Sequence, residues 1–426
     1  ESWITMEGLV RSLVSIYSDR LEQDTRTPTY TFSVPGIDGG SIGILTSGGP
    51  LAFWVQMATI LPMQSIVRVF LACIVYNFII QRRGTLMAYL VGYGFVLPFV
   101  ILLPFYVIPL LGIRNVCLMI AISSTPIFVT FNCLEAMYGT SPPIVERDLW
   151  TYCIYYSSPI PFLISDKTQQ VKKASKEEIT SKAKACFLNV ALTSLLLSVL
   201  IPFAYEPFSS PRQIGQPLDS FLDVFHTGHL LNNYILAYLT FLCLDGGTLA
   251  VAVTIGLLTG FSTVTVMHAP MTESLSPSEF WGKRWNRMIH AVLKRAVYLP
   301  LRKYAVSKTA ASIITFVVSG LLHEYILAII YLKGNMSPEE QRRNYGMHMA
   351  FFAYNGIVVL IERALSGNKY IEALLKPLPK PAITALVILT VIPVSHWFTD
   401  EYVMSGFYTD YSLGFPKIVY IPNEST

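Results

Sequence analysis

Long runs of apolar residues, separated by short polar interruptions, constrain this chain more than any other feature. A helix needs about 20 mostly apolar residues to cross the hydrocarbon core of a bilayer. The runs also lack the in/out alternation of lipid-facing barrel strands and are too long for them. We therefore predict an all-α, polytopic transmembrane helical bundle of about 8–10 spans, with amphipathic helices at the interface. The clearest runs cover residues 83–113, 117–138, 185–205, 311–332 and 382–398.

The composition agrees with a protein that is solvated by lipid. Of 426 residues, 53% are hydrophobic and only 14% are charged, and the mean hydropathy is +0.49. These values exclude an ordinary water-soluble domain, and we expect no nucleic-acid partner. The six cysteines are scattered singly, without a CxxC pair, so we predict neither a disulfide framework nor a zinc site.

Polar segments divide the chain. Residues 1–50 are polar and rich in turn signals, which predicts an extramembrane N-terminal segment, followed by one membrane-embedded domain over residues 51–426. The Lys-rich segment 166–184 should lie in water on the cytoplasmic side. Asp245-Gly246-Gly247 interrupts an apolar run, either as a tight loop or as an intramembrane acid at a helix break. The sequence opens at Glu1 without a leader, which leaves open whether an upstream segment is missing.

An ionisable residue inside an apolar span normally faces the bundle interior and has a function or a partner there. His323 is the strongest such case, because helical spacing places Thr315, Ser319 and His323 on one face. A neutral imidazole at this depth can take a proton from an alcohol, or it can simply hydrogen-bond across helices. A zinc site of the HExxH type is excluded because Leu327 occupies the position of the second histidine.

A second cluster combines aromatic and basic residues over residues 277–303. Two tryptophans at a spacing of four, Trp281 and Trp285, suit an amphipathic helix at the membrane interface. The same residues fit a binding site for the phosphates of coenzyme A, in which Asn286 supplies an amide donor to an oxyanion. Composition alone leaves both interpretations open.

The two clusters together resemble a known family. The stretch Phe-Trp-Gly-Lys-Arg-Trp-Asn at 280–286, followed by Ser-Gly-Leu-Leu-His-Glu at 319–324, resembles the paired motifs of the membrane-bound O-acyltransferase superfamily. It is most similar to the wax synthase branch, whose motifs read much like FWGRRWN and SGLxHE. The sterol and diacylglycerol acyltransferase branch has Asp-Trp-Trp-Asn at the first motif and fits less well. The resemblance is sharp over residues 268–332.

The resemblance implies a function and a site. The protein would transfer a fatty acyl group from acyl-CoA to a lipid hydroxyl, most simply a long-chain alcohol. The alternatives within the same reaction class are transfer to diacylglycerol, which makes triacylglycerol, and acetylation of a terpenoid or sterol alcohol. A proton-coupled transporter is the alternative from another class of protein. His323 and Asn286 would be catalytic, with no cofactor beyond acyl-CoA as co-substrate, and the protein would reside in the endoplasmic reticulum membrane. We place eight further residues at the substrates: Trp281, Lys283, Arg284, Trp285, Arg287, Ser319, Glu324 and Asn355.

Three other sets of polar residues invite a functional interpretation. His226 and His229 have a spacing that fits a metal, but no further ligand except Asp223 lies nearby in the sequence, which favours a loop or helix-start role. His348, Asn355 and Glu362 recur every seven residues, so they share a helix face that either lines the site or bonds to another helix. The pair His396-Trp397 suggests an interfacial aromatic belt.

Overall fold

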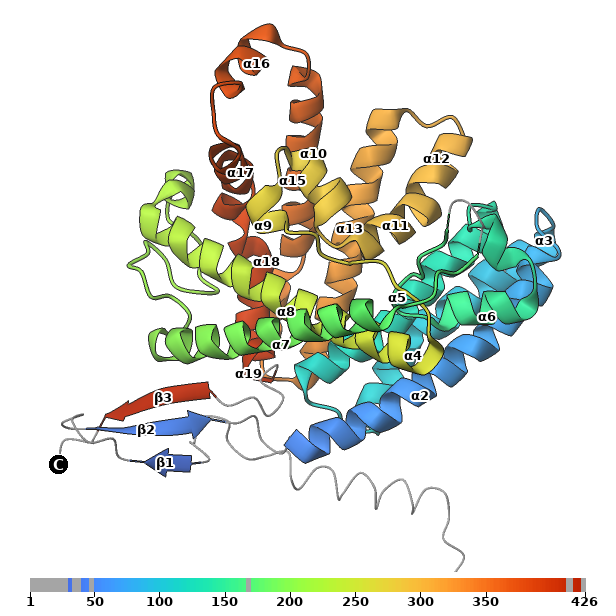
Figure 1. The fold of residues 1–426 in the computed structure, drawn as a ribbon, viewed down its shortest axis with the longest axis horizontal. Coiled ribbons are helices and arrows are strands. Elements are labelled where there is room, and N and C mark those ends of the chain that lie inside the picture. Colours follow the sequence, from blue (N-terminus) through green and yellow to red (C-terminus); the bar gives the residue numbers. More distant parts are fainter. Residues whose placement is uncertain (1–29, 33–39, 46–49, 166–169, 411–416, 423–426) are drawn as a thin grey trace, which may run out of the picture.

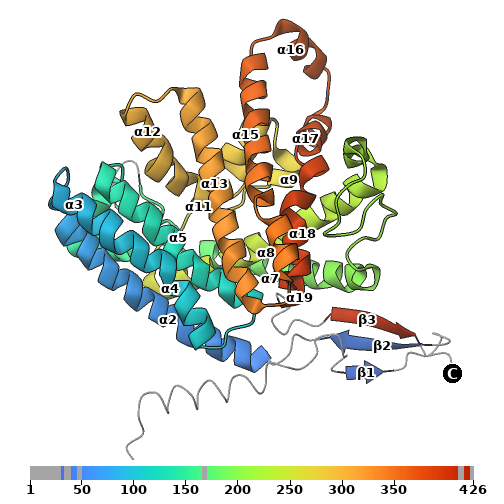
Figure 2. The same ribbon diagram turned by 180° about the vertical axis from the view of Figure 1, so that it is seen from behind.

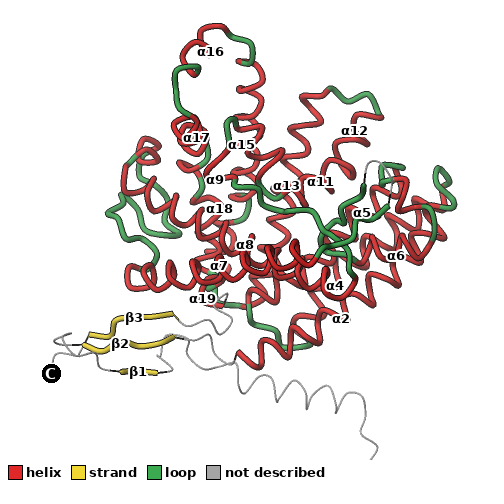
Figure 3. The backbone as a smooth tube through the Cα atoms, viewed as in Figure 1, coloured by secondary structure: helices red, strands yellow, loops and turns green. Residues whose placement is uncertain are grey.

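The computed structural model describes residues 30–32, 40–45, 50–165, 170–410 and 417–422, and helices dominate them (Figure 3). Within this part of the chain, six helices are long and apolar enough to cross a membrane. Two bent helix pairs raise the number to eight if each pair is one span. The predicted all-α polytopic bundle is therefore confirmed, but its six to eight candidate spans reach only the lower end of the 8–10 expected.

The helices of the N-terminal half form the right-hand side of the view in Figure 1 and the long pair below its centre. In chain order they are α2 (Pro50–Ile74), α3 (Leu86–Val91), α4 (Leu97–Leu110), α5 (Val116–Tyr138), α6 (Leu149–Ser157), α7 (Lys176–Leu200) and α8 (Thr227–Thr259). A π-helical turn, Val75–Ile80, extends α2, and another, Gly92–Val96, joins α3 to α4, so that each pair forms one span.

The C-terminal half opens with a set of short helices. The short set comprises α9 (Pro270–Glu273), α10 (Pro277–Glu279), α11 (Arg287–Leu293) and α12 (Leu299–Lys303). The remainder are α13 (Lys308–Ile330), α14 (Pro338–Asn344), α15 (Met347–Leu365), α16 (Lys369–Leu375), α17 (Lys380–Leu389), α18 (His396–Met404) and α19 (Phe407–Asp410).

The helices differ in how much of their surface the protein covers. Of the most apolar window of α5, 78% is buried, whereas the corresponding share for α7 is 17%. Apolar side chains that the protein leaves exposed on a spanning helix can be covered by lipid tails. Helix α5 therefore lies in the interior of the bundle, and α7 lies on its lipid-facing periphery.

Helices α13 and α15 run side by side in both ribbon views (Figures 1 and 2) and form one of the most extensive helix contacts of the described structure. Glycines permit the close approach. A Cβ on Gly320 of α13 would lie 2.7 Å from the Cα of Met349, and a Cβ on Gly356 of α15 would lie 3.1 Å from the Cβ of Phe316. Small residues at helix contacts let backbones approach within a membrane.

A small antiparallel sheet lies at one edge of the helical body (Figure 1). Strands β1 (Tyr30–Phe32), β2 (Gly40–Leu45) and β3 (Lys417–Pro422) pair in that order, with Ile42 opposite both Phe32 and Tyr420. The sheet thus joins the beginning of the chain to its end. Most of the segment predicted to be extramembrane, residues 1–50, lies outside the described residues.

Asp245 does not interrupt its helix. Helix α8 runs unbroken through Asp245-Gly246-Gly247, contrary to the loop or break that the sequence suggested. The Asp245 carboxylate accepts a hydrogen bond from Asn189 Nδ2 on α7 at 2.7 Å. An amide partner lowers the cost of an acid inside a span, and here it also joins α7 to α8.

Candidate active site

A cavity of about 280 Å³ lies among α11, α13, α15 and the segment that precedes α11. Both predicted catalytic residues, His323 and Asn286, line it. Its wall combines the aromatic rings of Trp281, Trp285, Phe316 and Phe352 with hydroxyl groups and two cationic side chains. A largely apolar cavity with a few convergent polar groups is the usual form of a site for a small organic substrate.

The polar stripe predicted on α13 faces this cavity. Thr315, Ser319 and His323 all line it, as their spacing of four requires on one helix face. Ser307 starts the helix, since its Oγ accepts the backbone N–H of Ala310. The structure therefore confirms the prediction that these three side chains lie on one face of the helix.

Aromatic packing orients the His323 ring. The ring stacks on Phe352, with centroids 4.7 Å apart and planes 9° apart, and Phe398 meets it edge-on at 5.0 Å. Its Nδ1 atom is buried and has no hydrogen-bond partner in the described part of the chain. No carboxylate of a described residue therefore orients this histidine through that nitrogen, unlike the histidine of a serine-protease triad.

Asn286 has two structural roles beside its place on the cavity wall. Its backbone is left-handed, with φ at 41°, a conformation that asparagine tolerates better than most residues. Its Oδ1 accepts the backbone N–H of Ile289 at 3.2 Å and so caps α11. Because the cap uses the oxygen, the side-chain amide group remains as the donor of this residue.

The side chains of Trp281 and Trp285 line the cavity. The tryptophans of an interfacial anchor would instead point into lipid. Trp281 meets Phe316, Phe351 and Phe352 edge-on at centroid distances of 5.8 to 6.3 Å. It therefore connects the short π-helical turn Phe280–Arg284 to both α13 and α15. Edge-to-face pairs of this kind stabilise a fixed arrangement of rings.

The basic residues expected at the substrate lie off the cavity wall. Arg284 forms ion pairs with Glu279 at 2.9 Å and Glu273 at 2.8 Å, so its charge is already matched. Arg287 Nη1 donates to the carbonyl oxygen of Thr265 at 3.4 Å, and neither Arg287 nor Lys283 lines the cavity. The structure thus uses Arg284 to hold the first motif in shape.

Two other cations line the cavity, Lys294 and Arg363. Arg363 Nη1 donates to Ser312 Oγ at 3.1 Å, which fixes it against α13. His290 lines the same wall, and burial, then the charges of Lys294 and Arg287, lower its pKa, so its ring is neutral at pH 7. The cavity therefore carries an excess of positive charge.

A spacing of four could have revealed part of this wall from the sequence. Asn286, His290, Lys294 and Tyr298 follow at intervals of four, and all line the cavity. Arg363 has no comparable signal, because it comes from α15, and its approach to Ser312 depends on how α15 packs against α13.

Glu324 and Asn355 also lie off the cavity wall. Glu324 Oε1 accepts the backbone N–H of Met349, at 3.1 Å, in the first turn of α15. Asn355 is fully buried and donates to the carbonyl oxygen of Phe351 on its own helix. Neither side chain lines the space that a substrate would fill.

His348 lies directly behind His323. Its Nδ1 is 3.4 Å from the carbonyl oxygen of His323, and its Nε2 is 3.1 Å from that of Phe398. The His348 ring approaches the His323 ring edge-on at 6.0 Å. This buried ring thus links α15 to α13 and to α18 at the level of the proposed reaction centre.

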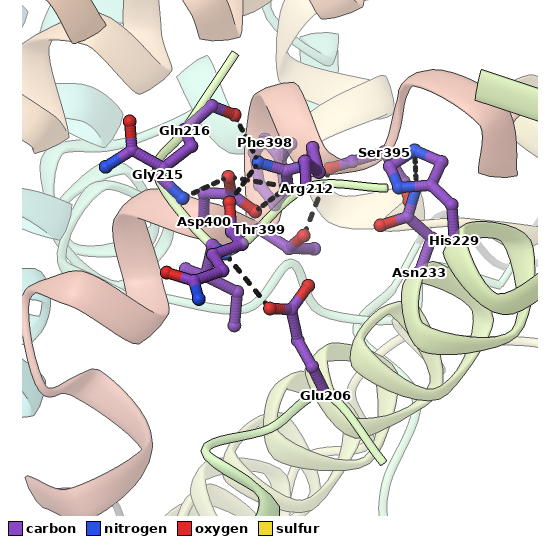
Figure 4. Close-up of polar contacts among 12 residues, drawn as sticks. Glu206, Arg212, Gly215, Gln216, His229, Asn233, Ser395, Phe398, Thr399 and Asp400 are labelled. Atoms are coloured by element: carbon purple, nitrogen blue, oxygen red, sulfur yellow. Dashed lines mark hydrogen bonds and ion pairs between the residues drawn. The ribbon is translucent and has the colours of Figure 1, made fainter. Parts of the chain in front are cut away.

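A buried polar cluster lies around α18 (Figure 4). Arg212 Nη2 donates to both oxygens of Asp400, at 2.8 and 2.7 Å, and the backbone N–H of Gly215 donates to the same carboxylate. The loop between α7 and α8 is thereby fastened to α18. Phe398, two residues before Asp400, packs against His323.

The histidines that resembled a metal pair have other partners. His226 caps the start of α8, with its Nδ1 accepting the backbone N–H of Gly228, as a helix-start role predicts. His229 lies near Asn233 Nδ2 and the carbonyl oxygen of Pro393, in the cluster of Figure 4. His396, expected in an interfacial belt, is buried next to His229.

The chain is similar to known acyltransferases over the region that forms this cavity. Residues 253–354 match the model of the membrane bound O-acyl transferase family. The resemblance that the motifs predicted is confirmed. The matched region contains His323 and Asn286 but not Arg363.

Curated relatives agree over similar segments. The chain is 31% identical over 127 residues to a probable long-chain-alcohol O-fatty-acyltransferase of Arabidopsis thaliana, over 28% of this chain and 33% of the relative. An acyl-CoA–sterol O-acyltransferase of the same plant is 35% identical over 96 residues, or 21% and 25% of the two chains. A diacylglycerol O-acyltransferase of Oryza sativa is 39% identical over 51 residues, or 12% and 9%. The match thus covers about a third or less of each relative.

Proposed function

We propose that this integral membrane protein is an O-acyltransferase that moves a fatty acyl group from acyl-CoA to the hydroxyl of a long-chain alcohol, forming a wax ester. The observation that carries this proposal is the meeting of His323 and Asn286, from two separate motifs, on the wall of one aromatic cavity. The similarity to a probable long-chain-alcohol acyltransferase over this region supports the choice of acceptor. We place the protein in the endoplasmic reticulum membrane, as the family resemblance implies.

The reaction uses these residues in a single acyl transfer. The neutral His323 ring takes the proton of the acceptor hydroxyl as its oxygen bonds to the thioester carbonyl carbon. The Asn286 amide donates a hydrogen bond to the oxyanion of the tetrahedral intermediate. The carbon–sulfur bond then breaks, and the coenzyme A thiolate leaves and accepts the proton from His323. Because a thioester is already activated, the transfer needs no metal or prosthetic group.

The two cations of the cavity suit the acyl donor. Coenzyme A carries phosphates, and guanidinium and ammonium groups are the side chains that bind phosphates best. Lys294 and Arg363 both line the cavity, and Ser312 holds Arg363 in place. We therefore assign them to acyl-CoA, in place of Lys283, Arg284 and Arg287.

The lipid products formed by a host that lacks neutral-lipid synthesis test the proposed function. Cells expressing the chain and supplied with long-chain alcohol should accumulate wax esters, and cells expressing His323→Ala should not. Triacylglycerol or sterol esters in place of wax esters would reassign the acceptor to diacylglycerol or a sterol, as the other two relatives suggest. A well-expressed chain that forms no ester from any of these acceptors would contradict the proposal and favour a transporter.

A further inference from the structure

The second motif consists of two interleaved pairs of residues on α13. Ser319 and His323, four apart, line the cavity. Gly320 and Glu324, also four apart, face α15, and both contact Met349. The missing side chain of Gly320 leaves room for the Met349 Cα, and the carboxylate of Glu324 accepts the Met349 backbone N–H. One helix face thus lines the cavity while the adjoining face fixes a neighbouring helix.

Glu324 acts at a position where a carboxylate is especially effective. The first turn of a helix has backbone N–H groups without intrahelical partners and the positive end of the helix dipole. Helix α15 begins at Met347 after Gly346, which provides no side-chain cap. The buried carboxylate of Glu324 therefore supplies the cap of α15 from another helix.

The same first turns of α15 hold the His323 ring. The Nδ1 atom of His348, next to Met349, lies 3.4 Å from the carbonyl oxygen of His323, and Phe352, one turn later, stacks on the His323 ring. Any displacement of the start of α15 therefore moves His348 and Phe352, two of the groups that contact His323. A displacement of about 1 Å at a reaction centre can cost on the order of 10²-fold in rate.

We infer that Glu324 is a positioning residue, which sets the place of α15 against α13 and, through His348 and Phe352, the orientation of His323. The inference deepens the proposed function and rests on it for its kinetic part. Glu324 itself does not line the cavity, so it acts on the reaction only through α15.

Two substitutions of Glu324 separate this role from a direct one. Glu324→Gln keeps an oxygen that can accept the Met349 N–H, whereas Glu324→Ala removes it. We expect Glu324→Ala to lower kcat by roughly 10²-fold with KM for acyl-CoA changed less than about threefold, and Glu324→Gln to retain kcat within about fivefold. Equal losses in both variants, or full kcat in Glu324→Ala, would overturn the inference.

Glu340 provides the matched control. Its carboxylate accepts the Ser337 backbone N–H in the cap of α14, a helix that contributes no residue to the cavity. Glu340→Ala should therefore leave kcat unchanged. A loss of kcat equal to that of Glu324→Ala would show that loss of any helix cap has this effect, and would overturn the specific role of Glu324.

Hydrogen exchange gives a readout that does not depend on acyl transfer. Backbone amides of residues 347–352 in detergent-solubilised protein should exchange faster in Glu324→Ala than in the wild type, but not in Glu324→Gln or Glu340→Ala. Unchanged exchange in Glu324→Ala would overturn the inference even in an active enzyme. If Glu324→Ala exchanges faster than the wild type, but the wild-type protein forms no ester, the result would contradict only the proposed function.

Discussion

At the scale of single residues, the two proposed catalytic side chains are held in different ways, one by aromatic packing and the other by a hydrogen bond. His323 is held by the rings of Phe352 and Phe398 and retains a buried Nδ1 without a partner in the described structure. Asn286 is held by a hydrogen bond, because its oxygen caps α11. The histidine is thereby kept in a poorly solvated setting, and the asparagine is left with its amide as donor.

Substitution of Asn286 separates its cap from its donor. Asn286→Asp keeps an oxygen for the Ile289 N–H but replaces the amide donor by a carboxylate, which repels an oxyanion. We expect turnover to fall by roughly 10²–10³-fold in Asn286→Ala, and further in Asn286→Asp, with acyl-CoA affinity nearly unchanged. Steady-state kinetics and direct acyl-CoA binding measure both quantities. Full activity of the Asp variant would remove Asn286 from the reaction centre.

Substitution of Arg363 tests the assignment of the acyl donor. Arg363→Ala should raise KM for acyl-CoA by roughly tenfold while kcat stays within about threefold, because a phosphate contact distant from the reacting carbonyl is the same in ground and transition states. Arg342→Ala is the control, since Arg342 is an exposed cation on α14 outside the cavity. The assignment fails if the two variants have the same KM.

At the scale of secondary structure, the strength of the sequence signal decided what could be predicted. Apolar length marked the bounds of α5 and α13 to within three residues, because a span must be long and nearly free of charge. The helical period likewise placed Thr315, Ser319 and His323 on one surface. The π-helical turn at Phe280 and helix α11 have no comparable signal, because tertiary packing of Trp281 and a cap by Asn286 define them.

The contact between α13 and α15 makes a prediction at this scale. Gly320→Ala places a Cβ 2.7 Å from the Met349 Cα, which forces the two helices apart. We expect the thermal midpoint of unfolding to fall and turnover to fall with it, since overpacking typically costs about 1–3 kcal/mol. Gly94→Ala is the control, because among the described residues no atom beyond its own stretch of helix lies within 4 Å of the added Cβ. A Gly320→Ala protein as stable and active as Gly94→Ala would contradict this account of the contact.

At the scale of the whole molecule, one loop brings the two basic segments together. Lys182 Nζ donates to the carbonyl oxygen of Thr263, and the backbone N–H of Arg287 donates to that of Val266. The start of α7 and the first motif thus lie along the same stretch of chain. The cationic excess of both segments predicts that they face the same, cytoplasmic side of the membrane. The sheet that joins residues 30–32 and 40–45 to residues 417–422 has no comparable signal in the sequence.

Cysteine accessibility in a cysteine-free background tests this topology. Lys176→Cys and Lys283→Cys should react with a membrane-impermeant reagent from the same, cytoplasmic side. Asn335→Cys is the matched control, since the spanning helix Lys308–Lys333 separates it from the first motif, and it should react only from the opposite side. Labelling of residues 176 and 283 from opposite sides would rule out the arrangement.

The central claim is that His323 removes the proton of the acceptor hydroxyl, and turnover of purified His323→Ala tests it most directly. The matched variant is His290→Ala, which removes another cavity histidine from α11. With labelled acyl-CoA and a long-chain alcohol, wild-type protein should form ester, and His323→Ala should be slower by about 10²–10⁴-fold with its thermal unfolding little changed. His290→Ala should keep most of its turnover. A folded His323→Ala protein with near wild-type acyl transfer would contradict the account.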